Sequence, residues 1–441
     1  MSADFVRVLG AGLAGCEAAW QLAERGVAVR LAEMKPNKKT PAHHENGFAE
    51  LCCSNSLRSD ALSNAVGLLK EEMRRVGSLV MEAADQTRVP AGSALAVDRT
   101  LFSEYITTRI KNHPLITVEE TEITALPDDA PTVVATGPLT TDALAADIVR
   151  LTGQSGLNFF DAVAPIVDFA SIDMDVAFFA SRYDKGDADY INCPMTKAQY
   201  DVFYEALISA REAELKDFDK RELKVFEGCM PVEVMARRGY DTLRYGPLKP
   251  VGLIDPRVGH EYFAVVQLRK ENKEGTMYNL VGFQTHLTFP EQKRVFSLIP
   301  GLENATFLRY GVMHRNTYLS SPGFLADTYA TKENPALFFA GQMTGVEGYI
   351  ESAGSGLVAG INAARFARNM PTITLPRHTM LGAMAAYVAE GGIGDFVPMN
   401  ANFGLVERLA QKVRGGKAKR NEALSQRALD ALDAVLSDLK A

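Results

Sequence analysis

The pattern of apolar and polar positions near the start of the chain predicts a strand, a helix and a second strand. A short apolar run over 6–9 leads into a glycine-rich turn, and a helix-forming segment follows and ends near Gly26. A second apolar run over 27–32 ends at the acidic residue Glu33. This order is that of a βαβ unit, in which two parallel strands share a sheet and a helix crosses it.

Further strands and helices are predicted at wider intervals along the chain. Apolar residues at helical spacing predict helices over 68–82 and 98–110. Buried strands that end at glycine are predicted over 132–137 and 336–342, and the second precedes a Gly- and Ala-rich helix over 351–368. The glycine-rich turn after the first strand is typical of dinucleotide-binding folds. We therefore expect the strand over 132–137 to close one nucleotide-binding half. The strand, glycine and helix from 336 to 368 are typical of the C-terminal half of an FAD-binding fold, where the dinucleotide fold resumes.

Between these two strands the character of the sequence changes. Aromatic residues become more frequent from about residue 156, and segments 262–268 and 277–283 flank a polar turn, which predicts a hairpin. Residues 404–439 show an amphipathic helical pattern interrupted by two glycines. We therefore expect an α/β protein with a Rossmann-like FAD-binding domain and an inserted α+β domain. The expected division is 1–155 for the first part of the FAD-binding domain, 156–324 for the inserted domain, and 325–441 for the second part with the C-terminal helices.

The turn after the first strand has the spacing Gly-x-Gly-x-x-Gly. Gly10 permits a tight turn, Gly12 lets the backbone approach a pyrophosphate, and Gly15 lets the helix pack closely on the strand. The helix N-terminus faces the phosphates, and Glu33, 23 positions after Gly10, accepts hydrogen bonds from ribose hydroxyls. The predicted FAD-binding residues are Gly10, Ala11, Gly12, Leu13, Ala14, Gly15, Glu33, Gly341 and Gln342.

Composition and charge exclude some classes of function and leave others open. The 441 residues include 47 Lys and Arg against 54 Asp and Glu, and the formal charge of −7 gives no global case for nucleic acid. Basic clusters within 237–249 and 412–420 keep RNA open as a partner. No apolar run approaches the roughly 18 residues of a membrane span, and the first strand leaves no room for a signal peptide. Five cysteines without a Cys-x-x-Cys pair predict reduced thiols and a cytoplasmic location.

Two cysteine segments are candidates for chemistry. Cys53 lies in a polar loop soon after the predicted ribose-binding strand, and Cys229 lies in a Gly-Cys turn just ahead of a predicted helix that carries arginines. A helix N-terminus and nearby arginines favour the thiolate, which is the nucleophilic form of cysteine. A small buried hydrophobe is the alternative for both, and it is the interpretation adopted for Cys16, Cys52 and Cys193.

The histidines and the single glycine module set further limits. His43, His44, His286 and His314 are candidates for acid–base or stacking roles, and an ordinary surface histidine is the alternative for His314. No ligand spacing for a metal is present, so we expect no metal site. No second glycine module is present to hold a nicotinamide permanently, and a nicotinamide would therefore visit the same open face as the substrate.

Four segments resemble the TrmFO family, the bacterial folate- and FAD-dependent tRNA uracil-5-methyltransferases. They are Gly10-Ala-Gly-Leu-Ala-Gly15 with Glu-Ala-Ala-Trp20, the Cys53-Ser-Asn-Ser-Leu-Arg-Ser loop, the Phe226-Glu-Gly-Cys-Met-Pro block, and Gly341-Gln-Met-Thr-Gly-Val-Glu-Gly-Tyr349. The stretch 241–252 also matches, and the resemblance runs essentially end to end. Where the family has one cysteine after Glu-Leu-Val, this chain has Cys52 and Cys53, and we align Cys53 with the functional position.

The resemblance implies methylation of uracil C5 in tRNA, at uridine 54 of the T-loop. It implies 5,10-methylenetetrahydrofolate as the one-carbon donor, reduced FAD (FADH2) as the hydride source, and NADH or NADPH as the reductant. By the same resemblance Cys229 adds to C6 of the ring, Cys53 removes the C5 proton, and His314 stacks on the pterin. The implied partners are tRNA and these small molecules, with no membrane, and the oligomeric state stays open.

Several other functions are compatible with parts of this pattern. A relative that methylates ribosomal RNA would share almost every motif. A flavoprotein that modifies wobble uridines shares the glycine loop, but it is longer and lacks both cysteine blocks. A flavin disulfide reductase would need two closely spaced cysteines on a helix and a second nucleotide domain, which this chain lacks. A non-catalytic FAD-binding RNA chaperone also stays open.

Overall fold

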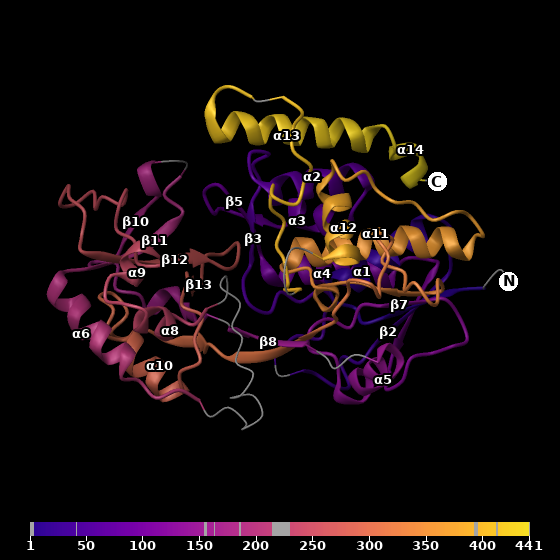
Figure 1. The fold of residues 1–441 in the computed structure, drawn as a ribbon. Helices are drawn as coiled ribbons and strands as arrows, with labels where there is room; N and C mark the ends of the chain where they lie inside the picture. The colour runs from indigo at the N-terminus through magenta and orange to yellow at the C-terminus, as the bar shows by residue number, and fades with distance from the viewer. Residues whose placement is uncertain are drawn as a thin grey trace.

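The structure is a computed structural model that describes most of the chain. The described residues are 4–40, 42–153, 157–162, 164–184, 187–213, 230–391, 396–411 and 413–440. Figure 1 shows two lobes, with a parallel sheet and its helices on one side and an antiparallel sheet with shorter helices on the other. Each lobe has its own cluster of buried apolar side chains.

The first sheet has five parallel strands in the order β16-β7-β1-β2-β6. They are β1 (Val6–Leu9), β2 (Val29–Glu33), β6 (Ile116–Glu120), β7 (Thr132–Val134) and β16 (Leu337–Phe339). Val6 pairs with Val29 and Leu9 with Ala32, so the two predicted strands of the first unit lie side by side. Strand β16 pairs with β7 and completes the sheet only after the chain returns from the second lobe.

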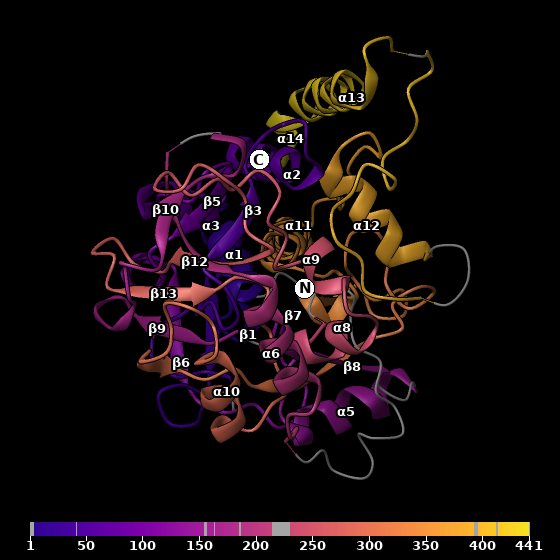
Figure 2. The same ribbon diagram turned by 90° about the vertical axis from the view of Figure 1, so that its left-hand side faces the viewer.

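Helices cover this sheet and close its core. The central pair is α1 (Leu13–Glu24) and α11 (Tyr349–Ala367), which pack closely because α11 is rich in small residues. A Cβ on Gly356 would lie 2.2 Å from the carbonyl oxygen of Ala14, so only glycine fits there. The other helices of this lobe are α2 (Ala65–Val76), α3 (Leu79–Gln86), α4 (Arg99–Lys111), α5 (Asp142–Thr152), α12 (Met380–Glu390), α13 (Gly416–Asp433) and α14 (Leu436–Lys440). Both views place α13 and α14 beside α2 at one edge of the molecule (Figure 2).

The second lobe is built on a six-stranded antiparallel sheet with the order β10-β11-β12-β13-β9-β14. Its strands are β9 (Ile166–Asp168), β10 (Phe178–Ala180), β11 (Tyr190–Met195), β12 (Ala264–Lys270), β13 (Met277–Leu280) and β14 (Phe307–Arg309). Strands β12 and β13 form the predicted hairpin, with Leu268 opposite Leu280. The helices of this lobe are α6 (Lys197–Ile208), α8 (Val232–Arg237), α9 (Thr242–Tyr245) and α10 (Phe289–Phe296).

Two small sheets complete the fold. Strands β8 (Leu157–Ala162) and β15 (Met313–Tyr318) pair antiparallel and run between the lobes in Figure 1. Strands β3 (Ser56–Ser59), β4 (Arg88–Val89) and β5 (Ala94–Val97) form a sheet beside the parallel sheet. Short 3-10 turns occur at η1 (Phe169–Ser171), η2 (Arg182–Asp184) and η4 (Gln342–Thr344).

Two of the predicted helices are wrong in extent. The single helix expected over 68–82 is two helices, because Gly77 takes a left-handed conformation with φ 92° and Ser78 caps the next helix by accepting from the Met81 amide at 3.2 Å. The amphipathic pattern over 404–439 becomes helical only from Gly416 onward. The carbonyls of residues 407 and 408 instead accept hydrogen bonds from the Arg427 side chain on α13, which holds that segment in an irregular form.

Candidate active site

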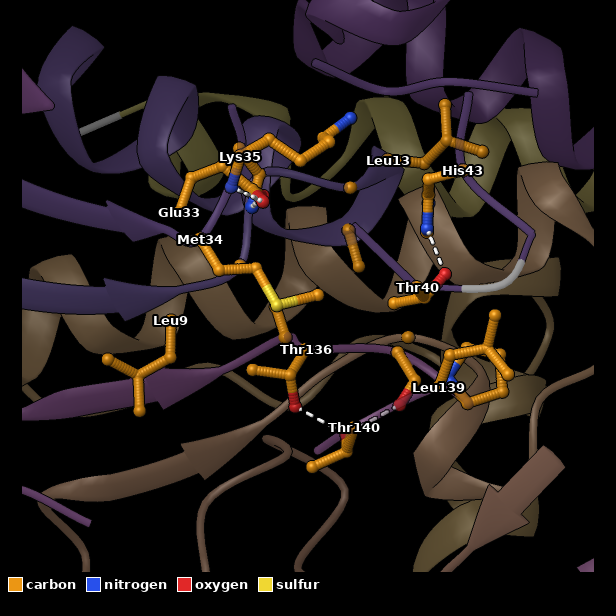
Figure 3. Close-up of a pocket in the computed structure, with 18 of the residues that line it drawn as sticks. Leu9, Leu13, Glu33, Met34, Lys35, Thr40, His43, Thr136, Leu139 and Thr140 are labelled. Carbon is orange, nitrogen blue, oxygen red and sulfur yellow. Dashed lines mark hydrogen bonds between the residues drawn. The ribbon is translucent and has the colours of Figure 1, made fainter. Parts of the chain in front are cut away.

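A cavity lined by described residues opens at the carboxyl ends of the parallel strands. Its empty space is about 1370 Å³, which includes open solvent at its mouth. Figure 3 shows Glu33 and Lys35 on one side of it and the hydrogen-bonded pair Thr40 and His43 on the other. The predicted cofactor-binding residues along its wall are Gly10, Ala11, Gly12, Leu13, Ala14, Glu33, Gly341 and Gln342.

The glycine loop has the geometry of a phosphate cradle. Gly10 has φ +92°, and a Cβ on it would lie 2.8 Å from the Ala135 carbonyl oxygen. Gly15 lies behind the cavity wall, where a Cβ would lie 1.8 Å from the Gly10 carbonyl oxygen. Gly12 has nothing within 4 Å of its Cβ position and is the N-cap of α1, with no side chain capping the helix. The first amides of α1 therefore remain available to an anion in the cavity.

Glu33 is fixed in place by backbone amides at the end of β2. Its two carboxylate oxygens accept from the Ala11 amide at 2.8 Å and the Lys35 amide at 2.9 Å, so the side chain links β2 to the glycine loop. Each oxygen keeps a further lone pair for a ribose hydroxyl. The hydrogen bonds hold the acid in position before any ligand arrives, which lowers the entropic cost of binding.

The second glycine segment brings another helix N-terminus to the cavity. The Gly341 amide donates to the Ser355 hydroxyl at 2.7 Å, and the Gln342 side chain donates to Glu347 at 2.6 Å. Helix α11 then begins at Tyr349 with a glycine N-cap and no side-chain cap. Two helix N-termini, those of α1 and α11, therefore meet at this cavity.

Cys53 lies on the wall of the same cavity and contacts the first residue of α11. Its backbone amide donates to the Tyr349 phenol oxygen at 2.7 Å, and its Sγ lies 2.8 Å from that oxygen. The Ser54 amide donates to the same oxygen at 3.3 Å. Burial, reinforced by Cys53, raises the pKa of the Tyr349 phenol well above its ordinary value. Sequence reasoning did not assign a role to Tyr349, although it ends one of the four family-like segments.

The second lobe supports the loop that carries Cys53. Arg269 at the end of β12 donates to Asn55 at 3.0 Å and to the Ser54 hydroxyl at 2.7 Å. Asn55 in turn donates to the Lys270 carbonyl at 2.9 Å. Sequence reasoning missed these contacts, because residues about 215 positions apart meet only in the folded protein.

The other cysteines differ sharply from Cys53. Burial raises the pKa of the Cys52 thiol to about 12, and its weak contact to the Glu50 carbonyl spans 3.8 Å. Cys16 and Cys193 are fully buried, and burial raises the pKa of both thiols. Cys16 and Cys193 therefore fit the interpretation of packing residues. Cys52 is half-buried and lies on the wall of the same cavity as Cys53.

Cys229 lies outside the described residues, and so does the side chain of His314. The helix that follows Cys229 is held in place by its own polar contacts. Glu233 accepts from the Thr285 hydroxyl at 2.9 Å and the His286 amide at 2.7 Å. The backbone of His314 lies on β15 opposite residue 161.

The remaining predictions about histidines, metals and membranes can be compared with the described part of the chain. His43 lies in the cavity, where burial lowers the pKa of its ring to about 4, so the ring is neutral at physiological pH. The described residues contain no group of three His, Cys, Asp or Glu side chains with metal-site geometry. None of the described helices is both long and apolar enough to cross a bilayer.

Comparison with known proteins identifies close relatives. The family model described as GIDA, glucose inhibited division protein A, matches residues 5–371. Two similar proteins are named methylenetetrahydrofolate–tRNA-(uracil-5-)-methyltransferase TrmFO. The one from Acetivibrio thermocellus is 58% identical and the one from Listeria innocua is 57% identical, each over 434 residues, 98% of this chain and 99% of the relative.

Among solved structures, GidA of Aquifex aeolicus has a similar fold. Its form I crystal structure gives a TM-score of 0.71 at 18% identity, over 99% of this chain and 76% of that one. The form II structure gives 0.69 at 17% identity, over 100% of this chain and 74% of that one. At this identity the likeness concerns the fold alone, and it confirms the predicted α/β class with a Rossmann-like parallel sheet.

Proposed function

The chain belongs to the TrmFO family, and on that premise we propose that it methylates C5 of uracil in tRNA, at uridine 54 of the T-loop. The one-carbon donor is 5,10-methylenetetrahydrofolate, the resident cofactor is FAD, and NADH or NADPH is the reductant. The observation that carries the proposal is the position of Cys53, which lies on the wall of the cavity that the two glycine segments line. The proposed location is the cytoplasm, where tRNA is available.

The residues of the cavity fit FAD. The open Gly12 position and the uncapped N-terminus of α1 accommodate a pyrophosphate. Glu33 accepts from the ribose hydroxyls, and the N-terminus of α11 lies where negative charge on the reduced ring is favoured. When bound, reduced FAD supplies the hydride that converts the one-carbon unit into a methyl group.

The chain's own residues have three tasks in this reaction. Cys229 adds to C6 of uracil, which makes C5 nucleophilic toward the one-carbon unit. Cys53 accepts the proton that leaves C5 once the new bond has formed. The bond between C6 and the sulfur of Cys229 breaks as the methyl group is completed, which restores the C5–C6 double bond and frees the thiolate. His314 stacks on the pterin and orients the donor. The uridine leaves its stack to reach the cavity, as bases do in enzymes that modify them.

The second lobe positions the proposed base. Arg269 and Lys270 at the end of β12 hold residues 54 and 55, so the loop with Cys53 is fixed from the second lobe, whose helix α8 begins shortly after Cys229 in the sequence. We infer that the substrate binds between the two lobes, because Cys53 lies in the first lobe and the sequence around Cys229 leads into helix α8 of the second.

Mass spectrometry of RNA tests the proposal. The FAD-loaded enzyme is incubated with methylenetetrahydrofolate, a nicotinamide reductant and either tRNA or ribosomal RNA transcripts, and 5-methyluridine is measured. The expected result is one methyl group in tRNA that is lost when uridine 54 is replaced by cytidine. Cys229→Ala is expected to abolish transfer while flavin absorbance is retained, and methylated ribosomal RNA with unchanged tRNA would contradict the substrate.

A non-catalytic role is separated by the same variants. An FAD-binding RNA chaperone would keep full function in cells after Cys229→Ala, whereas a methyltransferase loses 5-methyluridine in cellular tRNA. Modification at the wobble position with an unmodified T-loop would instead assign the chain the activity of the longer wobble-uridine flavoproteins.

A further inference from the structure

The hydrogen bonds around Tyr349 determine where its proton points. A phenol group has one hydrogen to donate and an oxygen that accepts. Two backbone amides, those of Cys53 and Ser54, already donate to this oxygen at 2.7 and 3.3 Å. The remaining short contact, at 2.8 Å, is with Cys53 Sγ. The phenol keeps its proton because burial raises its pKa, and so the O–H donates and the sulfur accepts.

The charges around this loop give a second and independent observation. Arg99 on α4 pairs with the fully buried Glu271, with Nη2 and Nε at 2.7 and 3.1 Å from one carboxylate oxygen. Arg309 at the end of β14 lies within electrostatic range of Arg99, Glu271, Tyr349 and Cys53. Two arginines therefore face one carboxylate, which leaves one positive charge in excess.

The excess charge has no counter-ion among the described protein carboxylates. The Nε and Nη2 atoms of Arg309 are buried and have no hydrogen-bond partner in the described part of the chain. Burial lowers the pKa of Arg309 to about 10, with Arg99 acting in the same direction, so the guanidinium still carries its charge at neutral pH. A cation whose buried donors lack hydrogen-bond partners is unfavourable, and the site therefore favours an anion.

We propose that the resting enzyme holds Cys53 as a thiolate, stabilised by the Tyr349 hydroxyl and by the excess positive charge of Arg99 and Arg309 over Glu271. Tyr349 and Arg309 are then positioning residues that keep the sulfur ionised. The use of this thiolate as the base for the C5 proton rests on the proposed function, but its ionisation does not. A thiolate takes up the proton directly, whereas a thiol would first have to lose its own.

The neighbouring groups explain why only one of the two adjacent cysteines is affected. Cys52 has no hydroxyl donor among the described residues, and burial raises the pKa of its thiol to about 12. Three other sets of charged groups lie near the loop. Glu50 and Lys35 form a buried pair with 3.8 Å between the charged atoms, and Arg58 pairs with the buried Glu351, so each pair neutralises itself. Arg269, which donates to Asn55 and Ser54, adds a further positive charge on the side of the second lobe.

The pH dependence of alkylation tests the proposal in the FAD-loaded protein. Iodoacetamide is added at several pH values, and fragment-ion mass spectrometry separates labelling of Cys53 from labelling of Cys52. An ordinary thiol has a midpoint at about pH 8.5, and the expected midpoint for Cys53 is at least one pH unit lower. A midpoint at or above the ordinary value in the unmodified protein overturns the proposal.

Variants identify the groups responsible. Tyr349→Phe and Arg309→Gln are each expected to raise the Cys53 midpoint by about one pH unit, roughly a tenfold loss of thiolate at neutral pH. Arg309→Lys keeps the positive charge, and its Cys53 midpoint is expected to stay near that of the unmodified protein. Arg294→Gln removes an arginine that pairs with Glu291 on the surface of α10 and is the matched control.

The outcomes remain decisive if a variant fails to fold. Flavin absorbance and a melting curve check each protein. If Arg309→Gln is lost, the midpoint of the unmodified enzyme and the shift in Tyr349→Phe still decide the proposal. An unchanged midpoint in both Tyr349→Phe and Arg309→Gln overturns the assignment of partners. A low midpoint in a protein that methylates no RNA would refute the proposed function and leave this inference standing.

Discussion

Replacing Gly15 by alanine is expected to destabilise the fold itself. The new Cβ would lie 1.8 Å from the Gly10 carbonyl oxygen, and because carbon–oxygen contacts rarely fall below about 3.3 Å, α1 would have to retreat by about 1.5 Å. Helix α11 blocks that movement, since its Gly356 already lies against the Ala14 carbonyl. Overpacking of this kind costs about 1–3 kcal/mol, and removing a helical glycine returns about 0.5–1 kcal/mol.

The net loss for Gly15→Ala therefore lies between about 0 and 2.5 kcal/mol. Its central value of about 1 kcal/mol lowers the melting temperature by roughly 2–4 °C for a domain of this size. Differential scanning calorimetry of the flavin-free protein measures it. Gly12→Ala is the matched control, because nothing lies within 4 Å of its Cβ position and its φ of −74° suits alanine.

The control variant separates stability from cofactor binding. Gly12→Ala is expected to change flavin-free stability by less than about 1 kcal/mol, the difference between glycine and alanine at an N-cap. Its Cβ points to where the pyrophosphate approaches, so FAD affinity is expected to fall at least tenfold, about 1.4 kcal/mol, in a fluorescence titration. Equal destabilisation by both variants, or unchanged FAD affinity in Gly12→Ala, would refute this reasoning.

Three further predictions follow from buried carboxylates. Glu33→Gln keeps one acceptor oxygen for the two backbone amides that Glu33 binds. Because hydrogen bonds to charged groups contribute about 1.5–3 kcal/mol, the affinity for FAD measured by calorimetry is expected to fall about tenfold or more. An unchanged affinity would contradict this prediction. Glu271→Gln leaves the buried Arg99 without a negatively charged partner and is expected to cost about 3–5 kcal/mol in urea unfolding. The surface control Glu291→Gln is expected to cost less than about 1 kcal/mol, and similar losses in both variants would show that burial is not the cause. Burial raises the pKa of Glu72 to about 8. The folded protein therefore holds a proton that the unfolded chain releases near pH 4.3, about its ordinary pKa, so this carboxyl's contribution makes stability fall as pH rises between these values. Urea unfolding at several pH values in that range is expected to show a weaker dependence of stability on pH in Glu72→Gln than in the unmodified protein. An unchanged dependence would exclude Glu72 as its source.

The junction between the lobes links the cofactor cavity to the inserted sheet. Arg269 and Glu271 at the end of the β12–β13 hairpin bind the loop with Cys53 and the start of α4, respectively. A change in the tilt of the antiparallel sheet would therefore move the sulfur relative to the cavity. This coupling gives a physical reason for chemistry that depends on both lobes.

The sequence by itself determined the features that depend on local geometry. Strand, glycine turn, helix and acid at the start of the chain follow from periodicity over a few residues and from the backbone freedom of Gly10. The α/β class, the hairpin and the strand before Gly341 follow from the same short-range rules. The roles of Cys229 and His314 remain predictions from the resemblance.

Only the tertiary structure decided which side chains meet. Cys53 and Tyr349 are 296 positions apart in the chain, and nothing in their local sequences specifies a contact of 2.8 Å between sulfur and oxygen. The same holds for Arg309. Its local sequence indicates only a charged residue in a short strand, and the fold brings it within electrostatic range of Arg99 and Cys53. The end of helix α2 at Gly77 could also not be predicted from the sequence, because helix propensity alone allows the helix to continue past this residue. Backbone preferences act over a few residues, whereas burial and charge pairing act through space and exist only after the lobes have packed together.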